Sequence, residues 1–114
     1  MSTVSIHPYF KIKPGKTEIV RATAKELVAL CQPEPGCEYF GFSFDGDKMF
    51  CREAYKGAAG VLAHLDNAGA AMGPIFENTE LLKLEVHGTA EELEKLKAPL
   101  AELNPTYFVL ELGS

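Results

Sequence analysis

The chain reads Glu38-Tyr39-Phe40-Gly41-Phe42-Ser43-Phe44, then Asp45-Gly46-Asp47, then Met49-Phe50-Cys51-Arg52-Glu53-Ala54-Tyr55-Lys56. Alternating segments on either side of an Asp-Gly turn predict a β-hairpin. Antiparallel pairing across the turn places one set of side chains on the same face: Phe40, Phe42, Phe44, Met49, Cys51, Glu53 and Tyr55. Because each phenylalanine contributes about 1.5–3 kcal/mol when it is fully buried, we expect this face to be covered.

The opposite face of the hairpin also carries large rings. Tyr39 and Phe50 lie there, together with Arg52. A sheet that is buried on both sides needs more material than a chain of 114 residues supplies, and a second copy of the chain is the simplest source. The sequence therefore predicts a homodimer.

The remaining elements complete a recognisable order. Patterns of apolar residues predict a strand, a helix, the hairpin, a second helix, another strand, a short helix capped by Thr89, and a last strand: 4–12, 16–31, 38–56, 58–72, 80–87, 89–100 and 107–112. Pro8 cannot donate a backbone hydrogen bond, so it requires an edge, a bulge or a gap in pairing. The order predicts one α+β domain over residues 1–114, a ferredoxin-like βαββαβ fold with an extra C-terminal helix and strand.

Composition excludes several classes of function. The net charge is −5 and the eleven basic residues are scattered, which argues against binding nucleic acid. No stretch approaches the roughly 20 apolar residues that span a bilayer, and the start of the chain lacks the features of a signal peptide, so we expect a cytoplasmic protein. The three cysteines, an odd number without a Cys-x-x-Cys pair, predict buried, reduced thiols.

An ordered combination of motifs resembles the antibiotic biosynthesis monooxygenase-like (ABM) family. The motifs are Ile12-Lys13-Pro14-Gly15-Lys16, Arg52-Glu53-Ala54-Tyr55-Lys56 and Ala63-His64-Leu65, and the resemblance extends from Val4 to Leu112. It implies a dimeric α+β barrel in which two sheets pack face to face, with residues 107–112 as an exchanged or interface strand.

The resemblance also implies an activity. Family members with a known activity oxidise aromatic polyketides, quinols or haem, often without flavin or metal, in a pocket between sheet and helices. This chain has no tryptophan, whereas the haem-degrading and anthrone-oxidising branches rely on one. Haem degradation is therefore not expected, and oxygenation of a polyketide-type substrate loses support.

His64, His7, Tyr9 and Tyr55 are the candidate catalytic residues. His64 matches the family's helix histidine, and histidine titrates near neutral pH, so it could relay a proton. The helical pattern places it at the border of the sheet contact, where a half-exposed structural role is the alternative. His7 and Tyr9 share one face of the first strand and would suit a pocket, although a solvated strand face explains them nearly as well.

Four further residues are candidate substrate contacts. Arg52 could hold a substrate oxygen with its planar guanidinium group, the alternative being a structural ion pair. Phe42, Met72 and Phe76 would form apolar walls. Glu53 shares the phenylalanine face, where a carboxyl group needs a partner or a raised pKa.

Cofactors and metals find no support in the sequence. The three histidines lack metal-binding spacing, and no glycine-rich phosphate loop is present, so we expect neither a bound metal nor a nucleotide cofactor. Two hypotheses remain. The first is a cofactor-independent monooxygenase acting on a small aromatic or quinol-type substrate. The second is a non-catalytic dimeric module of the same fold that binds a small molecule or serves as a structural partner.

Overall fold

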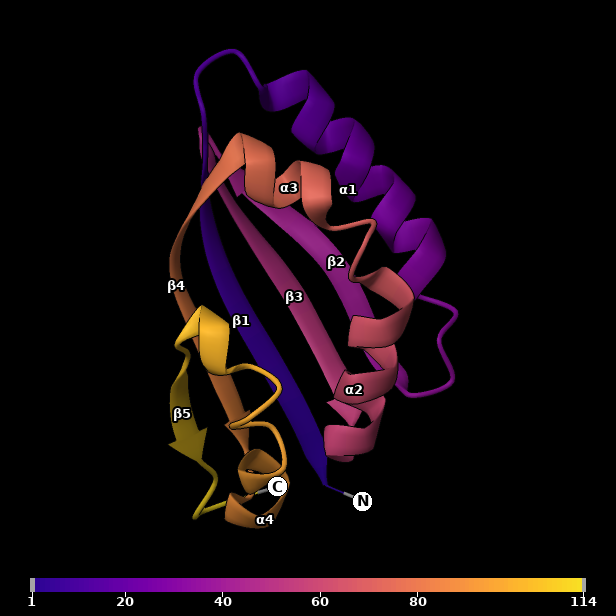
Figure 1. Ribbon diagram of the computed structural model, residues 1–114, viewed down its shortest axis with the longest axis vertical. Coiled ribbons are helices and arrows are strands. Elements are labelled where there is room, and N and C mark those ends of the chain that lie inside the picture. The colour runs from indigo at the N-terminus through magenta and orange to yellow at the C-terminus, as the bar shows by residue number, and fades with distance from the viewer. Residues whose placement is uncertain (1, 114) are drawn as a thin grey trace.

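A computed structural model describes residues 2–113. Its elements, in chain order, are β1 (Thr3–Ile12), α1 (Thr17–Cys31), β2 (Cys37–Asp45), β3 (Lys48–Lys56), α2 (Gly57–Ala68), α3 (Gly73–Asn78), β4 (Thr79–Gly88), α4 (Ala90–Glu94), the 3₁₀ helix η1 (Ala101–Leu103) and β5 (Thr106–Val109). Figure 1 shows the strands as one sheet with the helices in front of it. The order confirms the predicted βαββαβ fold with a C-terminal helix and strand.

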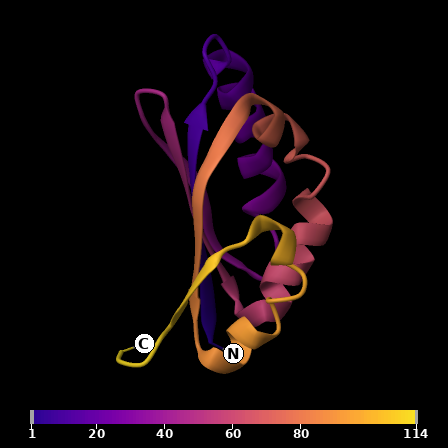
Figure 2. The ribbon, with the colours of Figure 1, turned by 60° about the vertical axis from the view of Figure 1, so that its left-hand side comes forward.

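The sheet has the strand order β2-β3-β1-β4-β5, in which only the β4–β5 pair is parallel. The hairpin register pairs Phe40 with Glu53 and Phe42 with Cys51, which confirms the predicted shared face of these side chains. All of the helices lie on one side of the sheet, which Figure 2 shows nearly edge-on. Both groups of buried core residues involve the side chains that face these helices.

The predicted irregularity at Pro8 is present. Strand β1 pairs with β3 at Ile6–Glu53 and again at Tyr9–Phe50, and the two intervening pairs are missing from the ladder. A register shift against β4 follows between Tyr9 and Phe10. Because Pro8 has no N–H group, the central strand accommodates it as a gap in pairing.

The last strand differs from the expectation. Residues 107–112 were expected to form an exchanged or interface strand; within this chain β5 ends at Val109 and pairs with β4. The N–H group of Leu110 extends this ladder by donating to the carbonyl of Gly88 over 2.7 Å.

Thr89 is the N-cap of the short helix α4, as the sequence predicted. The Thr89 hydroxyl accepts a hydrogen bond from the N–H group of Glu92. The Glu92 carboxylate does not return to Thr89 but accepts the N–H group of Ala58 over 2.7 Å, which ties α4 to the start of α2. This hydrogen bond lowers the pKa of Glu92.

No helix within residues 2–113 is both long enough and apolar enough to cross a membrane.

Candidate functional site

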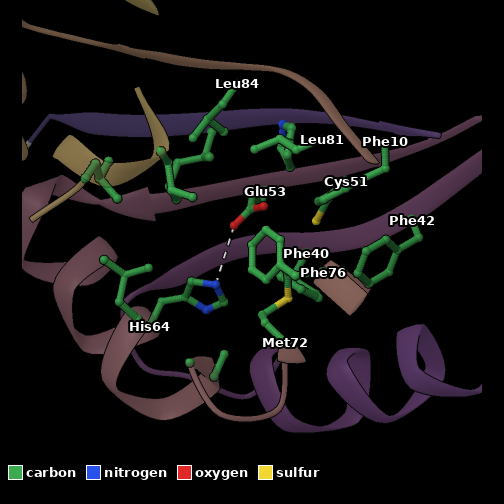
Figure 3. A pocket seen from close by; sticks show the side chains of 17 residues that line it. Phe10, Phe40, Phe42, Cys51, Glu53, His64, Met72, Phe76, Leu81 and Leu84 are labelled. Carbon is green, nitrogen blue, oxygen red and sulfur yellow. Dashed lines mark ion pairs between the residues drawn. The ribbon is translucent and has the colours of Figure 1, made fainter. Parts of the chain in front are cut away.

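A cavity of about 140 Å³ lies between the sheet and helices α2 and α3. Figure 3 shows the side chains that line it. Most are apolar, and two are polar: Glu53 from β3 and His64 from α2. Pro8 also lines the cavity, so the gap in the β1–β3 ladder lies at its wall. The site is therefore a largely apolar space with its polar groups gathered at one place.

The carboxyl group of Glu53 is the centre of these polar groups. It is 8% exposed, and that exposure is toward the cavity. The hydroxyl of Tyr55, two residues along the strand, donates a hydrogen bond to Glu53 Oε1 over 2.6 Å. Burial raises the pKa of Glu53, and the nearby hydroxyl and imidazole only partly offset that effect. The expectation that this carboxyl needs a partner is confirmed by the Tyr55 hydroxyl, and burial favours its neutral form.

His64 connects Glu53 to a second carboxyl group. Its Nε2 atom lies 3.6 Å from Glu53 Oε1, the contact drawn in Figure 3, and its Nδ1 atom lies 3.2 Å from both oxygens of Glu34. The ring also packs near those of Tyr55 and Phe40, with centroids 4.7 and 5.6 Å away. The residue is 6% exposed, so the expected position at the border with solvent was wrong.

The reason for that burial is the loop between α1 and β2. Gly36 and Gly60 meet backbone to backbone, and a Cβ atom added at Gly36 would lie 2.9 Å from the Cα of Gly60. The carbonyl of Gly36 also accepts the N–H group of Lys56 over 2.8 Å. This close approach brings the loop against α2, where Glu34 covers the imidazole.

Glu34 and Asn67 are functional candidates that the sequence reasoning missed. Asn67 lies one helical turn after His64, and its Nδ2 group donates to Glu34 Oε2 over 2.8 Å. The only local signal was the rigid Pro33-Glu34-Pro35-Gly36 segment, since proline on each side restricts the glutamate backbone. That signal does not by itself reveal which helix the loop meets.

Three cysteines lie near the cluster formed by Glu34, Glu53 and His64. Burial raises the pKa of Cys31 to about 12, and it also raises the pKa of Cys51 and Cys37. Donor atoms of Cys31, Glu34 and His64 lie within 4.8 Å of one another, a spacing that a metal ion could bridge. The carboxylate of Glu34, however, already accepts hydrogen bonds from His64 and Asn67.

The structure divides the residues that the sequence proposed. His64, Phe42, Met72 and Phe76 line the cavity, and Tyr55 lies beside it through its bond to Glu53. His7, Tyr9 and Arg52 lie on the opposite face of the sheet and do not meet them, because they alternate along their strands with residues that face the helices.

On that opposite face the three residues have other partners. His7 bonds Ser5 over 2.8 Å, and its ring lies 4.5 Å from that of His87. Tyr9 packs on Phe50 at 4.9 Å. The guanidinium of Arg52 lies 3.8 Å above the Tyr39 ring, so it stacks on an aromatic ring instead of holding a ligand in the cavity.

The raised pKa of Glu53 predicts a pH-dependent stability. The folded protein favours the neutral carboxyl, whereas the unfolded chain ionises it near the ordinary value of 4.5. Its contribution to stability is therefore complete below that pH and is lost as the pH rises through the folded-state pKa. We expect Glu53→Gln, which stays neutral, to gain in unfolding free energy relative to wild type as the pH rises from about 5 to about 8.

Urea unfolding at a series of pH values measures this difference, with the exposed Glu26→Gln as the matched control. Parallel pH profiles for wild type and Glu53→Gln would show that burial does not perturb this carboxyl.

No protein-family model and no curated protein sequence matches the chain. Solved structures do. MupZ from Pseudomonas fluorescens superposes with a TM-score of 0.92 at 39% identity, over 98% of this chain and 93% of MupZ. A Bacteroides thetaiotaomicron protein of unknown function, described as a possible oxidoreductase, has a TM-score of 0.70 at 25% identity, over 76% of this chain and 97% of that protein.

A third structure bears on the predicted family. A Nitrosomonas europaea protein, proposed to be an antibiotic biosynthesis monooxygenase, superposes with a TM-score of 0.62 over 77% of this chain and 86% of that protein. At 20% identity this likeness concerns the fold. The chain therefore belongs to the same family as MupZ, and it has the fold of the ABM-like proteins that its sequence resembles.

Proposed function

We propose that this protein is an acid–base enzyme that acts on a small, largely apolar molecule held in the cavity. The observation that carries the proposal is the carboxyl group of Glu53, buried at the wall of an apolar space and in contact with both Tyr55 and His64. Titratable groups whose pKa is shifted by burial and by specific partners are concentrated at functional sites. A carboxyl with a raised pKa exchanges protons close to neutral pH more readily than an ordinary one.

The class of reaction that we propose is the oxygenation of an aromatic or quinol-type substrate without a cofactor. The aromatic walls support it, since Phe40, Phe42 and Phe76 suit a flat ring. The fold supports it as well, because proteins with this fold include one proposed to be a monooxygenase. In the reaction, the carboxylate form of Glu53 removes a proton from the substrate, which leaves an electron-rich anion.

The anion is then the reductant for molecular oxygen. One oxygen atom enters the substrate and the other leaves as water, with all of the electrons supplied by the substrate. A C–O bond forms between the anion and oxygen, and the O–O bond then breaks as the same carbon loses its second hydrogen, which gives a carbonyl group and hydroxide. The hydroxide takes back the proton that Glu53 removed, so both substrate hydrogens end in the water. The apolar walls keep bulk water from quenching the anion.

The size of the cavity favours a second candidate. Ligand sites commonly enclose about 300–1,000 Å³, whereas this cavity measures about 140 Å³. Bulky side chains, among them Phe42 and Met72, line this small space. A module that binds a small apolar molecule without transforming it is therefore the alternative function.

The direct test is oxygen uptake. Aerobic incubation with a panel of dihydroxyanthracenes and quinols should give protein-dependent oxygen consumption, followed with an oxygen electrode. Because a general base contributes roughly 10²–10⁴-fold to a rate, Glu53→Gln should lose at least about a hundredfold in kcat. The exposed Glu26→Gln serves as the matched control and should keep wild-type rates.

The outcomes separate the two candidates. Substrate consumption that also proceeds without oxygen would retain acid–base chemistry and contradict oxygenation. Tight binding of a panel member without turnover in any condition would favour the binding module.

We also propose that the protein is a homodimer joined through the open face of its sheet. Large side chains on that face support it: Leu82 and Phe108 are 47% and 44% exposed. Phe108 stacks on His87 at 4.7 Å, beside the ring of His7. Charges of both signs, Lys83 and Glu85, accompany these apolar groups, so two copies of the face can complement each other.

Sedimentation equilibrium tests the dimer. At micromolar concentration the wild type should have twice the chain mass, and Phe108→Glu should shift the equilibrium toward the monomer by placing two like charges in the interface. The control Glu111→Gln, in the exposed tail, should remain dimeric. A wild type that sediments as single chains would contradict the proposal.

A further inference from the structure

We propose that Glu34 is the positioning residue of the site: it fixes the tautomer of His64 and takes up the proton that Glu53 releases through the imidazole. The inference rests on the proposed function for its catalytic consequence, while its structural part stands on the geometry alone. Neither Glu34 nor its partner Asn67 is a residue that the family resemblance pointed to.

The two nitrogens of His64 face two different carboxyl groups. Nδ1 lies 3.2 Å from each oxygen of Glu34, and Nε2 lies 3.6 Å from Oε1 of Glu53. An ionised carboxylate only accepts hydrogen bonds, so a neutral His64 beside Glu34 carries its proton on Nδ1. The lone pair on Nε2 then faces the carboxyl group of Glu53.

This arrangement lets a proton leave the cavity without water entering it. The proton of Glu53 moves to Nε2 of His64, and the proton on Nδ1 moves to Glu34. The imidazole ends neutral with its proton on the other nitrogen, Glu53 becomes the carboxylate that can act as a base, and Glu34 becomes the neutral acid. In total, one proton has moved from the carboxyl group of Glu53 to that of Glu34, and the net charge of the three groups is unchanged.

The Glu34 side chain is only 9% exposed, but it lies in a surface loop beside exposed groups, which gives its proton a way to solvent. It lies between Pro33 and Pro35, both exposed, and its bond to the exposed Asn67 lies at the surface. Asn67 also donates to the carbonyl of Leu30 over 3.3 Å, which fixes the amide against the end of α1. Glu53, in contrast, reaches only the cavity.

No other group in the cluster can replace His64 as the link. The residues whose charges or hydrogen bonds act on Glu53 are Tyr55, His64, Cys51 and Glu34. Burial raises the pKa of the Tyr55 hydroxyl and of the Cys51 thiol, so both keep their protons. Within this set, the imidazole of His64 is the one group that places a nitrogen toward each of the two carboxyl groups.

Two substitutions at Glu34 separate its two roles. Glu34→Gln keeps a carbonyl oxygen that can accept the Nδ1 proton but cannot take that proton up. Glu34→Leu removes the acceptor altogether. Glu38→Gln, at an exposed glutamate of the adjoining strand, is the matched control.

Nitrogen-15 NMR of the His64 ring at about pH 8, where an ordinary histidine is neutral, measures the tautomer without any substrate. Wild type, Glu34→Gln and Glu38→Gln should carry the proton on Nδ1, and Glu34→Leu should lose this preference. A wild-type ring that carries its proton on Nε2, or on both nitrogens, overturns the assignment because no lone pair then faces Glu53.

Turnover measures the second role. Both Glu34 variants should lose at least about tenfold in kcat with KM little changed, because substrate contacts are intact while proton removal is impaired. An unchanged kcat in Glu34→Gln, beside an active wild type, overturns the relay. If wild type shows no turnover with any substrate, the proposed function fails, whereas the NMR result still decides the tautomer.

Discussion

A carboxyl group buried on an apolar sheet face is the constraint on which this site depends. Strand β3 places Glu53 among phenylalanine and sulfur side chains, where an unpaired charge would be costly. The Tyr55 hydroxyl donates a hydrogen bond to this carboxyl group, and the His64 imidazole also lies close to it. Both partners are themselves buried, so the helix carrying His64 must pack where it does for the carboxyl to be accommodated.

That requirement links the fold to the chemistry. The hairpin sets the face on which Glu53 lies, and helix α2 follows the hairpin directly, so His64 falls back onto the same face. The contact between Gly36 and Gly60 then brings the loop carrying Glu34 over the outer side of the ring. Two turns of helix and one tight loop contact therefore build a line of three ionisable groups from the cavity to the surface.

The sequence predicted the parts of this arrangement that depend on local pattern. Alternation around the Asp-Gly turn correctly placed Glu53 on the same face as Phe40, and Pro8 predicted an edge, a bulge or a gap in pairing, of which the gap in β1 is present. The same alternation separates His7 and Tyr9 from the cavity, since their neighbours Ile6 and Phe10 face the helices. Expecting them beside His64 would have required both faces of one strand to reach a single pocket.

The contact between Glu34 and His64 could not be predicted in this way. It joins residues 30 positions apart through a loop whose docking depends on two glycines meeting closely. Helical periodicity predicts burial from the apolar residues of the helix itself, so it does not show that a loop from another part of the chain covers one of its side chains. For that reason His64 was expected at a solvent border and is instead covered.

We expect Glu53 to keep its proton at a pH where ordinary carboxyl groups have lost theirs, because burial raises its pKa. Infrared difference spectroscopy of wild type against Glu53→Gln at about pH 6 measures this directly. The wild type should show the carbonyl band of a protonated carboxylic acid, and the variant should lose it. A difference spectrum that contains only carboxylate bands at this pH would contradict it.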